Sequence, residues 1–408
     1  MHCGLCLSVC PTYALTGLER SSPRGRIRLM KNAMDGTIPF SETFKYEMDF
    51  CLDCQACQTA CPAGVEYGKL VESARALIAA RKTGIDIKRI ILRRLFGGRT
   101  WFRLAASLLR FYQKSGLEKV LLNLTSGLKG DFFARARLLP RLSERFSIDF
   151  LPEKIEARGT PRGKTAVLTG CVMDAMFADA NVDTVEVLVR NGWQVAVPHD
   201  QVCCGSVSAH SGDMELARKL AVRNMDVFEK TGAEYYVINS AGCSAFMKEY
   251  RELFASDPVY SKKAEEFSSK VKEFSEFISE TGYMKPSVKF DVPVTYHEPC
   301  HLVHTQKISG QPRSVVKDLA GQNFRELGEA TWCCGSAGIY NVTHVEAAAS
   351  LLERKLGNIE KSGAKVVVTG NPGCIAQIAA GARNDGKEIE VLHLATALNR
   401  LYKSEEDA

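Results

Sequence analysis

No stretch of this 408-residue sequence stays apolar over the roughly 20 residues that a membrane-spanning helix needs. The sequence also lacks a glycine-rich nucleotide-binding loop, so we expect this chain to bind neither NAD nor FAD. Histidine and tryptophan are scarce, at 8 and 3 residues. The composition is 45% hydrophobic and 25% charged, which is typical of a folded globular protein. No secretory leader precedes Cys3, and we therefore expect a cytoplasmic location.

Cysteine, in contrast, is abundant, at 15 residues. In a long chain of this composition, that number indicates metal or redox chemistry rather than a disulfide framework. Two N-terminal runs contain seven of these residues, and a proline follows the last cysteine of each run. The first run is Cys3, Cys6 and Cys10, and the second is Cys51, Cys54, Cys57 and Cys61. The second run has the C-x2-C-x2-C-x3-C-P spacing with which bacterial ferredoxins hold 4Fe–4S clusters.

The two runs predict two clusters, of which one has a complete ligand set. In ferredoxins of this type the first three cysteines of a run bind one cluster, and the fourth binds the other. The complete set is then Cys51, Cys54, Cys57 and Cys10. The other set is Cys3, Cys6 and Cys61, with its leading cysteine missing one position before Met1. A structural zinc site is the main rival interpretation, but a single tetrahedral zinc cannot use seven closely spaced thiols.

The missing cysteine has three possible explanations. The start of the sequence can be assigned too far downstream, and this is the explanation that we expect. The site can instead hold a three-iron or labile cluster. His2 can also replace the thiolate, since imidazole is a ligand in some iron–sulfur centres. However, His2 lies directly beside Cys3 in the sequence, which is poor geometry for a second ligand of the same cluster.

Sequence patterns divide the chain into four segments. Residues 1–82 carry the ferredoxin-type cysteines, and helical spacing over 68–81 indicates a helical module. Residues 83–163 form a basic segment that ends in a glycine- and proline-containing linker. Short apolar runs then alternate with helical patterns, which predicts an α/β domain with a mainly parallel sheet. This pattern occurs twice, over 164–285 and over 286–408.

The basic segment has 16 Lys and Arg against 4 Asp and Glu between Arg81 and Phe146. Aromatic and aliphatic residues alternate with its arginines, which predicts amphipathic helices. Such helices suit an anionic membrane surface or an acidic partner subunit. A solvated helical face is the alternative. We expect no nucleic-acid binding, because no recognised binding motif accompanies the charge.

The two α/β segments repeat one cysteine pattern. Each has a first cysteine, then a Cys-Cys-Gly-Ser sequence, then a Gly-Cys pair. The first intervals are 31 and 32 residues long, and the second intervals are 38 and 39. This match indicates a duplicated domain. The first copy contributes Cys171, Cys203, Cys204 and Cys243, and the second contributes Cys300, Cys333, Cys334 and Cys374.

Two interpretations of the repeated cysteines remain open, an iron–sulfur site or a redox-active thiol site in each copy. A third interpretation is that these cysteines are buried, inert thiols, since free cysteine is often buried. The matched spacing of the two copies argues against this interpretation. Two adjacent cysteines can bind different irons of one cluster. His297 and His301, beside Cys300, could tune a cluster or protonate a quinone. A structural histidine is an equally good reading for both, and for His199 near Cys203.

Taken together, these motifs resemble the iron–sulfur subunit of bacterial glycolate oxidase (glycolate dehydrogenase) over essentially the whole chain. The matching segments are His2–Cys6, Cys10–Tyr13, Ser22–Ile27, Cys51–Pro62 and both Cys-Cys-Gly sequences. The resemblance implies an α+β multidomain fold, with an α-helical ferredoxin module followed by a duplicated α/β cysteine-rich domain. It also implies a complex on the inner face of the cell membrane. There an FAD-containing subunit oxidises a 2-hydroxy acid, and this subunit passes the electrons toward quinone or another acceptor.

Related families supply the alternatives. The cysteine-rich repeats also resemble those of heterodisulfide reductases and of anaerobic glycerol-3-phosphate dehydrogenase. The heterodisulfide-reductase repeat ends in C-x2-C, but Ser240 and Asn371 occupy the first of those positions here. Each copy therefore has four cysteines rather than five. The other functions considered are an iron–sulfur subunit for lactate or glycerol 3-phosphate oxidation, and a thiol or disulfide reductase. We assign no catalytic residue to this chain.

Overall fold

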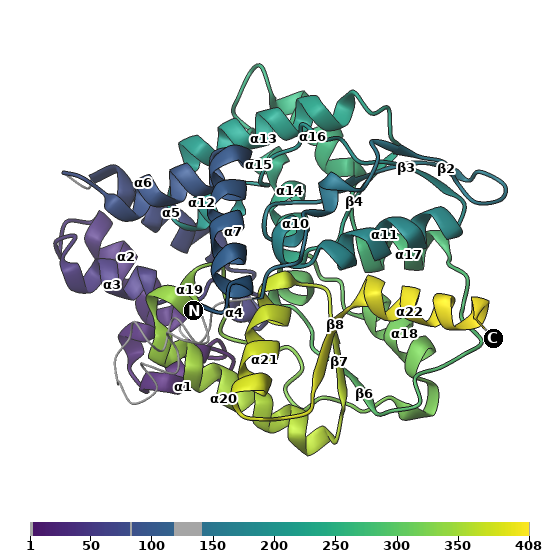
Figure 1. Cartoon of the computed structure of the whole chain (residues 1–408). Coiled ribbons are helices and arrows are strands. Elements are labelled where there is room, and N and C mark those ends of the chain that lie inside the picture. The colour runs from purple at the N-terminus through teal and green to yellow at the C-terminus, as the bar shows by residue number, and fades with distance from the viewer. Residues whose placement is uncertain (1–2, 82–83, 118–140, 408) are drawn as a thin grey trace.

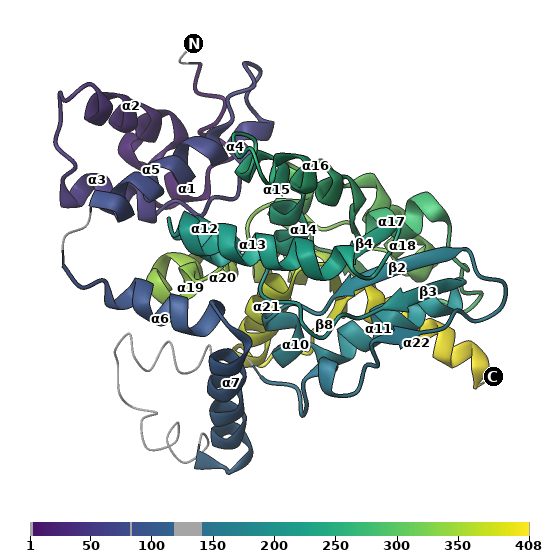
Figure 2. The same cartoon turned by 90° about the horizontal axis from the view of Figure 1, so that it is seen from above.

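The computed structural model describes residues 3–81, 84–117 and 141–407. An N-terminal helical module is followed by a two-helix arm and then by two α/β repeats (Figure 1). The view from above places the helical module at one end of the molecule, beside both repeats (Figure 2). The predicted fold class is confirmed, because helices form the cysteine-rich N-terminus and each later half has its own mainly parallel sheet.

The N-terminal module contains only helices and connecting turns within its described residues. Proline occupies the first turn of α1 and of α2, where a missing backbone N–H costs no hydrogen bond. The Ser22 and Ser41 hydroxyls cap α2 and α3. Phe44, Met48 and Val71 are buried in the module's own core. The helices are α1 Pro11–Thr16, η1 Glu19–Ser21, α2 Pro23–Met34, α3 Glu42–Asp49, α4 Ala56–Thr59 and α5 Tyr67–Arg81.

The arm consists of α6 (Ile87–Phe96) and α7 (Arg99–Lys114), followed later by the short η2 (Ser147–Asp149). The two helices agree with the amphipathic helices predicted for the basic segment. The rest of that prediction, over 118–140, lies outside the described residues, as does the suggestion that His2 is a ligand.

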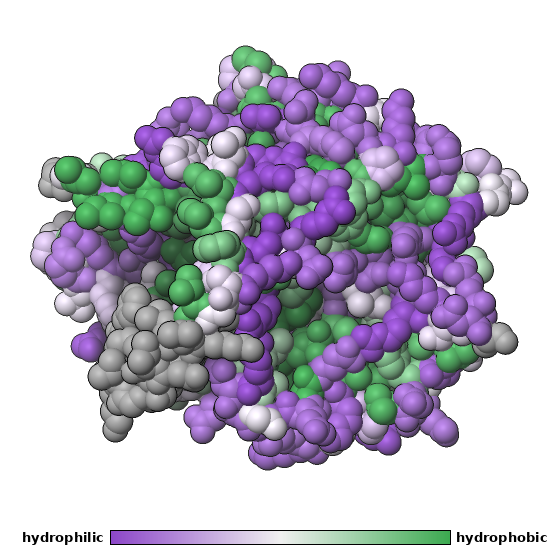
Figure 3. Space-filling view, viewed as in Figure 1, coloured by the Kyte–Doolittle hydropathy of each residue, from purple (hydrophilic) through white to green (hydrophobic). Residues whose placement is uncertain are grey.

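Several arginines of the arm face the protein, whereas many of its apolar residues face outward. Arg89 and Arg93 pair with Asp213 at 3.1 and 2.5 Å, and Arg103 pairs with Asp149 at 2.6 Å. Figure 3 shows an apolar patch over α6 and α7. Its exposed members include Ile87, Ile90, Ile91, Trp101, Leu104, Leu108 and Phe111. We call this surface the arm's apolar face. Among the described residues, no helix has the length and apolar character needed to cross a membrane.

The first repeat is built on a five-stranded sheet of order β1-β3-β2-β4-β5, parallel except for β1. Its strands are β1 Lys154–Ile155, β2 Gly163–Leu168, β3 Trp193–Ala196, β4 Tyr235–Ile238 and β5 Val271–Glu273. Its helices are α10 Val172–Met176, α11 Ala178–Arg190, α12 Ser206–His210, α13 Met214–Glu229, α14 Ala241–Lys248, α15 Tyr250–Leu253, α16 Ser261–Lys270 and α17 Phe274–Thr281.

The second repeat has a three-stranded parallel sheet of order β6-β7-β8. A single bridge from Phe324 to Val294 takes the place that β3 has beside β2, so both copies share one strand order. The strands are β6 Val294–Tyr296, β7 Val366–Thr369 and β8 Glu390–His393. The helices are η3 His301–Thr305, α18 Gly310–Ala320, η4 Gly321–Asn323, α19 Tyr340–Thr343, α20 Val345–Ser362, α21 Pro372–Asn384 and α22 Leu394–Glu406.

The two repeats share one hydrophobic core. Helices α11, α17, α18 and α22 lie between the two sheets (Figure 1), and their apolar residues belong to one buried cluster with both sheets. The boundary predicted at 285/286 falls in the stretch between α17 and β6. Because the core is common, the carboxyl ends of both sheets are held in a fixed relation to each other.

Candidate metal centres

Four cysteines from two distant segments line one small cavity in the helical module. Cys10 directly precedes α1, whereas Cys51, Cys54 and Cys57 lie on the turn between α3 and α4 and on α4 itself. Within that turn, Asp53 and Gln55 have positive φ angles of 54° and 59°. This left-handed backbone winds the chain around the cavity. The four residues are those that the ferredoxin spacing groups into one complete ligand set.

The donor set fits an iron–sulfur cluster. Burial, together with the neighbouring thiols, raises the pKa of Cys54 and of Cys57. Such thiols hold their protons unless a metal replaces them, and an iron cluster supplies that positive charge. Two donors also point at sulfur: the Asp53 N–H lies 3.3 Å from Cys51 Sγ, and the Tyr67 hydroxyl lies 3.6 Å from it. Hydrogen bonds of this kind tune cluster potentials.

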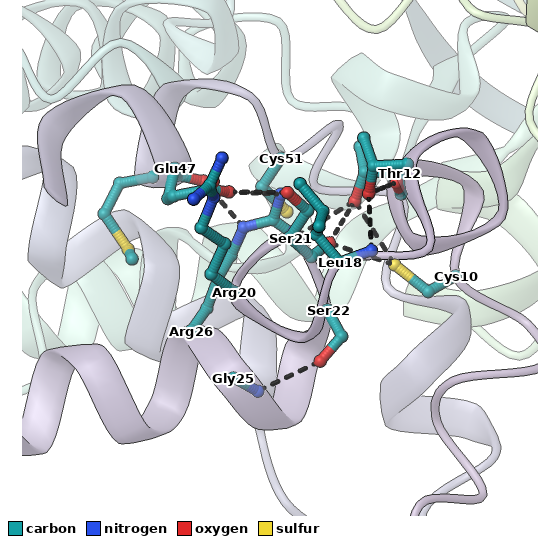
Figure 4. Close-up of polar contacts among 12 residues, drawn as sticks. Cys10, Thr12, Leu18, Arg20, Ser21, Ser22, Gly25, Arg26, Glu47 and Cys51 are labelled. Atoms are coloured by element: carbon teal, nitrogen blue, oxygen red, sulfur yellow. Dashed lines mark hydrogen bonds and ion pairs between the residues drawn. The ribbon is translucent and has the colours of Figure 1, made fainter. Parts of the chain in front are cut away.

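A buried arginine also lines this cavity, and Figure 4 shows its polar contacts. Arg26 is fully buried, and its guanidinium donates to the Glu47 carbonyl at 2.6 Å and to Thr12 Oγ1 at 3.0 Å. Burial alone lowers the pKa of Arg26, but the negative charges of Cys51, Tyr67, Cys10 and Glu47 raise it above its usual value. A permanent cation therefore faces the thiols, which suits an anionic cluster.

The segment Ser22–Ile27 explains how that cation reaches its place. Ser22 Oγ accepts from the Gly25 N–H at the start of α2, which fixes the first helical turn (Figure 4). Arg26 then projects from this turn into the module. Thr12 links the two parts, because its hydroxyl lies 3.3 Å from Cys10 Sγ and donates to the Ser21 carbonyl at 2.7 Å.

The incomplete set is arranged differently. Cys3 is exposed, and Cys6 and Cys61 are partly buried. None of the three lines the cavity of the complete set or the larger cavity described next. Backbone N–H groups of Val65, Ala63 and Gly64 lower the pKa of Cys61, which favours its thiolate form.

All eight cysteines of the repeats line a single cavity of about 250 Å³ between the repeats and the helical module. Two in each copy follow the strand ends: Cys171 and Cys243 follow β2 and β4, and Cys300 and Cys374 follow β6 and β7. The carboxyl ends of parallel strands are the usual position of binding sites in α/β folds. Cys51 of the helical module lines this central cavity as well. Cys51 therefore lines both cavities.

The backbone conformation explains why a glycine follows each Cys-Cys pair. Gly205 and Gly335 have φ angles of 94° and 88°, a region that favours glycine. A Cβ atom at Gly335 would also lie 2.7 Å from the Ala348 carbonyl oxygen. Each glycine therefore permits a tight turn that directs the two preceding cysteines toward the cavity.

Within each copy the sulfurs lie close together without a disulfide. Cys171 Sγ is 3.6 Å from Cys203 Sγ, and Cys334 Sγ is 3.2 Å from Cys374 Sγ. Ser240 and Asn371, at the position of the absent fifth cysteine, are the N-cap residues of α14 and α21. The Asn371 amide donates to Cys374 Sγ at 3.4 Å, so this side chain supports one of the predicted ligands.

The histidines singled out by the sequence have different surroundings. His301 lines the central cavity, where burial lowers its pKa to about 4. Burial and the Lys355 ammonium hold the pKa of His297 well below its usual value, so its ring is neutral. His199 lies 2.9 Å from the Leu151 carbonyl and lines neither cavity. It is a structural histidine.

A charged group that lines the central cavity, His210, was not predicted from the sequence. His210 Nδ1 lies 2.7 Å from a Glu72 carboxylate oxygen and 3.4 Å from Asp53. Although burial lowers it, the two carboxylates raise the pKa of His210 to about 10. Its ring lies 5.3 Å from that of His301. Asp53 stands between two predicted ligands, which was an available signal, but nothing in the sequence pointed to His210 or Glu72.

These two cavities, lined by cysteine and set in a ferredoxin module and between two repeats, define an iron–sulfur protein of the electron-transfer type. Family models agree with this class. A 4Fe–4S dicluster domain matches residues 1–65, and a cysteine-rich domain matches twice, over 165–248 and 294–379. The linker region of the glycolate oxidase iron–sulfur subunit matches residues 87–125, which include both helices of the arm.

Curated relatives show the family. A probable glycolate oxidase iron–sulfur subunit from Bacillus subtilis is 34% identical, over 98% of this chain and 92% of its own length. The glycolate oxidase iron–sulfur subunit of Escherichia coli is 29% identical, over 97% and 93%. Lactate utilization protein A from Shouchella clausii is 34% identical, over 56% of this chain and 95% of its own length. The chain belongs to the glycolate oxidase iron–sulfur subunit family. The prediction of an iron–sulfur electron-transfer subunit of the 2-hydroxy acid dehydrogenase class is confirmed.

Proposed function

We propose that this chain accepts electrons from an FAD-containing subunit that oxidises glycolate, and passes them toward quinone. The observation that carries this proposal is the position of Cys51, which lines both the ferredoxin cavity and the central cavity. Leu52 also lines both cavities, so the two sites share part of their lining at this point. That arrangement suits transfer of electrons from one bound group to the next, with no organic substrate between them.

The lining of the two cavities and the cysteine spacing of the sequence together support the proposed ligands. Cys10, Cys51, Cys54 and Cys57 hold one 4Fe–4S cluster, and Cys3, Cys6 and Cys61 contribute three ligands to a second. The eight cysteines of the central cavity hold further iron–sulfur groups. When bound, such clusters accept and release one electron at a time. The protein's own contribution is to bury the thiolates, to place Arg26 against them and to exclude water.

Apolar side chains exclude water where the two sites meet. Phe50, Leu52 and Tyr340 form one buried apolar cluster with Cys54 and Cys333. A dry environment of this kind keeps the local dielectric low and strengthens the influence of each fixed charge on a bound cluster. Cys54 and Cys333 therefore mark the route from the helical module into the second repeat.

Attachment to the inner face of the cell membrane is part of the proposal. The arm's apolar face exposes aliphatic and aromatic side chains, and Lys88 and Arg94 are exposed beside them. Apolar side chains next to cations suit the boundary between acyl chains and anionic headgroups. Quinone dissolves in the same layer, so this attachment would bring the acceptor close to the chain.

Lactate is a second candidate for the substrate of the partner. The similarity to lactate utilization protein A supports it, although that similarity covers 56% of this chain, against 98% for the Bacillus subtilis relative. The match to the Bacillus subtilis relative favours glycolate, because it covers nearly the whole chain and so includes the arm. In either case the oxidation of the 2-hydroxy acid takes place in the flavoprotein.

The experiment is anaerobic turnover of the chain co-purified with its flavoprotein partner. Glycolate should reduce the clusters of the wild-type complex and support quinone reduction. The Cys54→Ser complex should still reduce flavin with glycolate but should fail to reduce quinone, while Cys3→Ser retains the cluster of the complete set. Faster cluster reduction by lactate would select the second candidate. Full quinone reduction by the Cys54→Ser complex would contradict the relay.

A further inference from the structure

His297 has a buried side chain whose ring makes no hydrogen bond to the described residues. It follows β6 directly and is 1% exposed. Among the described residues, neither ring nitrogen has a hydrogen-bond partner. A buried polar atom without a partner is costly and calls for a specific explanation, such as a bound ion. The ring is therefore available as a donor to something that the second repeat binds.

The surroundings of the ring indicate what that partner is. One ring nitrogen of His297 and the sulfurs of Cys334 and Cys374 all lie within 4.8 Å of one another. All three residues are buried. Imidazole nitrogen and thiolate sulfur at this separation can bind to neighbouring positions of one metal centre. Cys334 is the second cysteine of the Cys-Cys-Gly sequence, and Cys374 is the last of the repeat, so the ring lies beside two residues that line the central cavity.

The first repeat has no counterpart to this histidine. Leu168, three residues before Cys171, occupies the position that His297 has three residues before Cys300, and it pairs with Ile238 of β4. A second difference lies close by. Lys355 on α20 is fully buried, and its ammonium donates to the Glu329 carbonyl at 2.6 Å. Asn224 occupies the equivalent position on α13. Its side chain accepts a hydrogen bond from the Val202 N–H and donates one to the Cys203 carbonyl. The duplicated sites therefore differ in chemistry.

We propose that His297 is a nitrogen ligand of the iron–sulfur group held by the second repeat. The proposal rests on the proposed function, in which Cys300, Cys333, Cys334 and Cys374 hold that group. His297 supplies a fifth donor in a repeat whose expected fifth cysteine is replaced by Asn371. The first repeat has only its four cysteines and receives no imidazole.

Different ligands make the two repeats electronically unequal. Exchange of an anionic thiolate for a neutral imidazole raises the reduction potential of an iron–sulfur centre. The Lys355 ammonium acts in the same direction, because a nearby positive charge favours the reduced, more negative cluster. The second repeat is consequently the preferred electron acceptor of the pair, and it is the one that contacts Cys54 through Cys333.

The test uses the anaerobically purified full chain, with histidine labelled by ¹⁴N or ¹⁵N. Pulsed EPR of the reduced protein should show a strongly coupled nitrogen that changes with the isotope. His297→Cys should keep the iron but lose this coupling, which separates ligand exchange from misfolding. His304→Gln is the matched control, because His304 lies on the next turn and bonds to Thr59. It should retain the coupling.

Two results would overturn the proposal in different ways. Clusters in both repeats without a histidine coupling, or with a coupling that survives in His297→Cys, would refute the ligand while leaving the relay intact. An N-terminal cluster accompanied by no iron in the second repeat would refute the ligand together with the cluster assignment of that repeat. Iron quantitation of the same samples distinguishes the two.

Discussion

Cys54 of the helical module packs in the same buried apolar cluster as Cys333 of the second repeat. Burial, and then the negative charges of Cys333 and Cys300, raise the pKa of Cys54. The contact joins a ligand of the predicted ferredoxin cluster to the first cysteine of a Cys-Cys-Gly sequence. The proposed path between the module and the repeats therefore runs through side chains that are predicted ligands.

Replacement of Cys54 by serine should remove one cluster from the chain. We expect a loss of about four irons and four sulfides per molecule, because a 4Fe–4S cluster with one of its four thiolates missing is labile. Iron and sulfide analysis of the anaerobic protein measures the change. Cys3→Ser is the control and should leave this cluster in place. Equal iron in the wild type and in Cys54→Ser would contradict the assignment.

The spacing of the cysteines predicts this ligand set, because the ferredoxin motif itself joins three cysteines of one run to the fourth cysteine of the other. The helical module, the duplication and most strands followed from short-range patterns. The central cavity did not, since it depends on how Cys51 and the eight repeat cysteines meet across three parts of the chain. The arm shows the same limit: its amphipathic pattern was evident, but only the pairing of Arg89 and Arg93 with Asp213 shows that the apolar face points outward.

Arg26→Met should destabilise the helical module strongly. Glu47 is 1% exposed and would keep a buried charge without the guanidinium that faces it at 3.8 Å. Removal of one member of a buried ion pair costs about 3–5 kcal/mol of unfolding free energy. Anaerobic denaturant unfolding measures this. Arg20→Gln removes a largely exposed partner of the same Glu47 and should cost no more than about 1 kcal/mol. Equal effects of the two variants would contradict the account.

His210 should make the protein less stable at alkaline pH. The carboxylates of Glu72 and Asp53 raise its pKa to about 10, against about 6.5 in the unfolded chain. A raised pKa stabilises the folded state fully below about pH 6.5, and this contribution disappears as the pH rises through 10. Unfolding free energy measured from pH 6 to 10 should therefore fall, and His210→Gln should flatten the fall. His199→Gln is the control. An identical pH profile for His210→Gln would exclude the charged pair.

Lys355→Met should lower the reduction potential of the second repeat. A unit charge acting over several ångströms at an effective dielectric constant of about 20 is worth about 2 kcal/mol, or roughly 90 mV for one electron. Burial lowers the pKa of Lys355 to about 8, so at pH 7 the side chain is mainly charged and the effect should be present. Redox titration followed by EPR measures it. Lys387→Met, on a lysine that pairs with Glu360 at 3.2 Å, should shift the potential little. An unchanged reduction potential in Lys355→Met would show that the Lys355 ammonium does not act on the cluster of the second repeat.

Loss of apolar side chains from the arm should weaken membrane attachment. A triple variant, Trp101→Gln, Leu108→Gln and Phe111→Gln, removes three exposed members of the arm's apolar face. Burial of one such side chain is worth about 1.5–3 kcal/mol, so partitioning should fall at least about tenfold. Sedimentation with vesicles of phosphatidylglycerol and phosphatidylethanolamine measures this. Val259→Gln, at an exposed residue away from the arm, is the control. Unchanged binding of the triple variant would assign this face to a protein partner.

The most direct test of the relay is the magnetic interaction between the cluster at Cys54 and the group at Cys333. EPR of the fully reduced wild-type chain should show signals broadened and split by coupling of neighbouring spins, because these two ligands belong to one buried cluster of side chains. Cys54→Ser should simplify the spectrum to that of the remaining centres. Uncoupled signals in a fully iron-loaded wild-type protein, unchanged by Cys54→Ser, would contradict the path of electrons from the helical module into the second repeat.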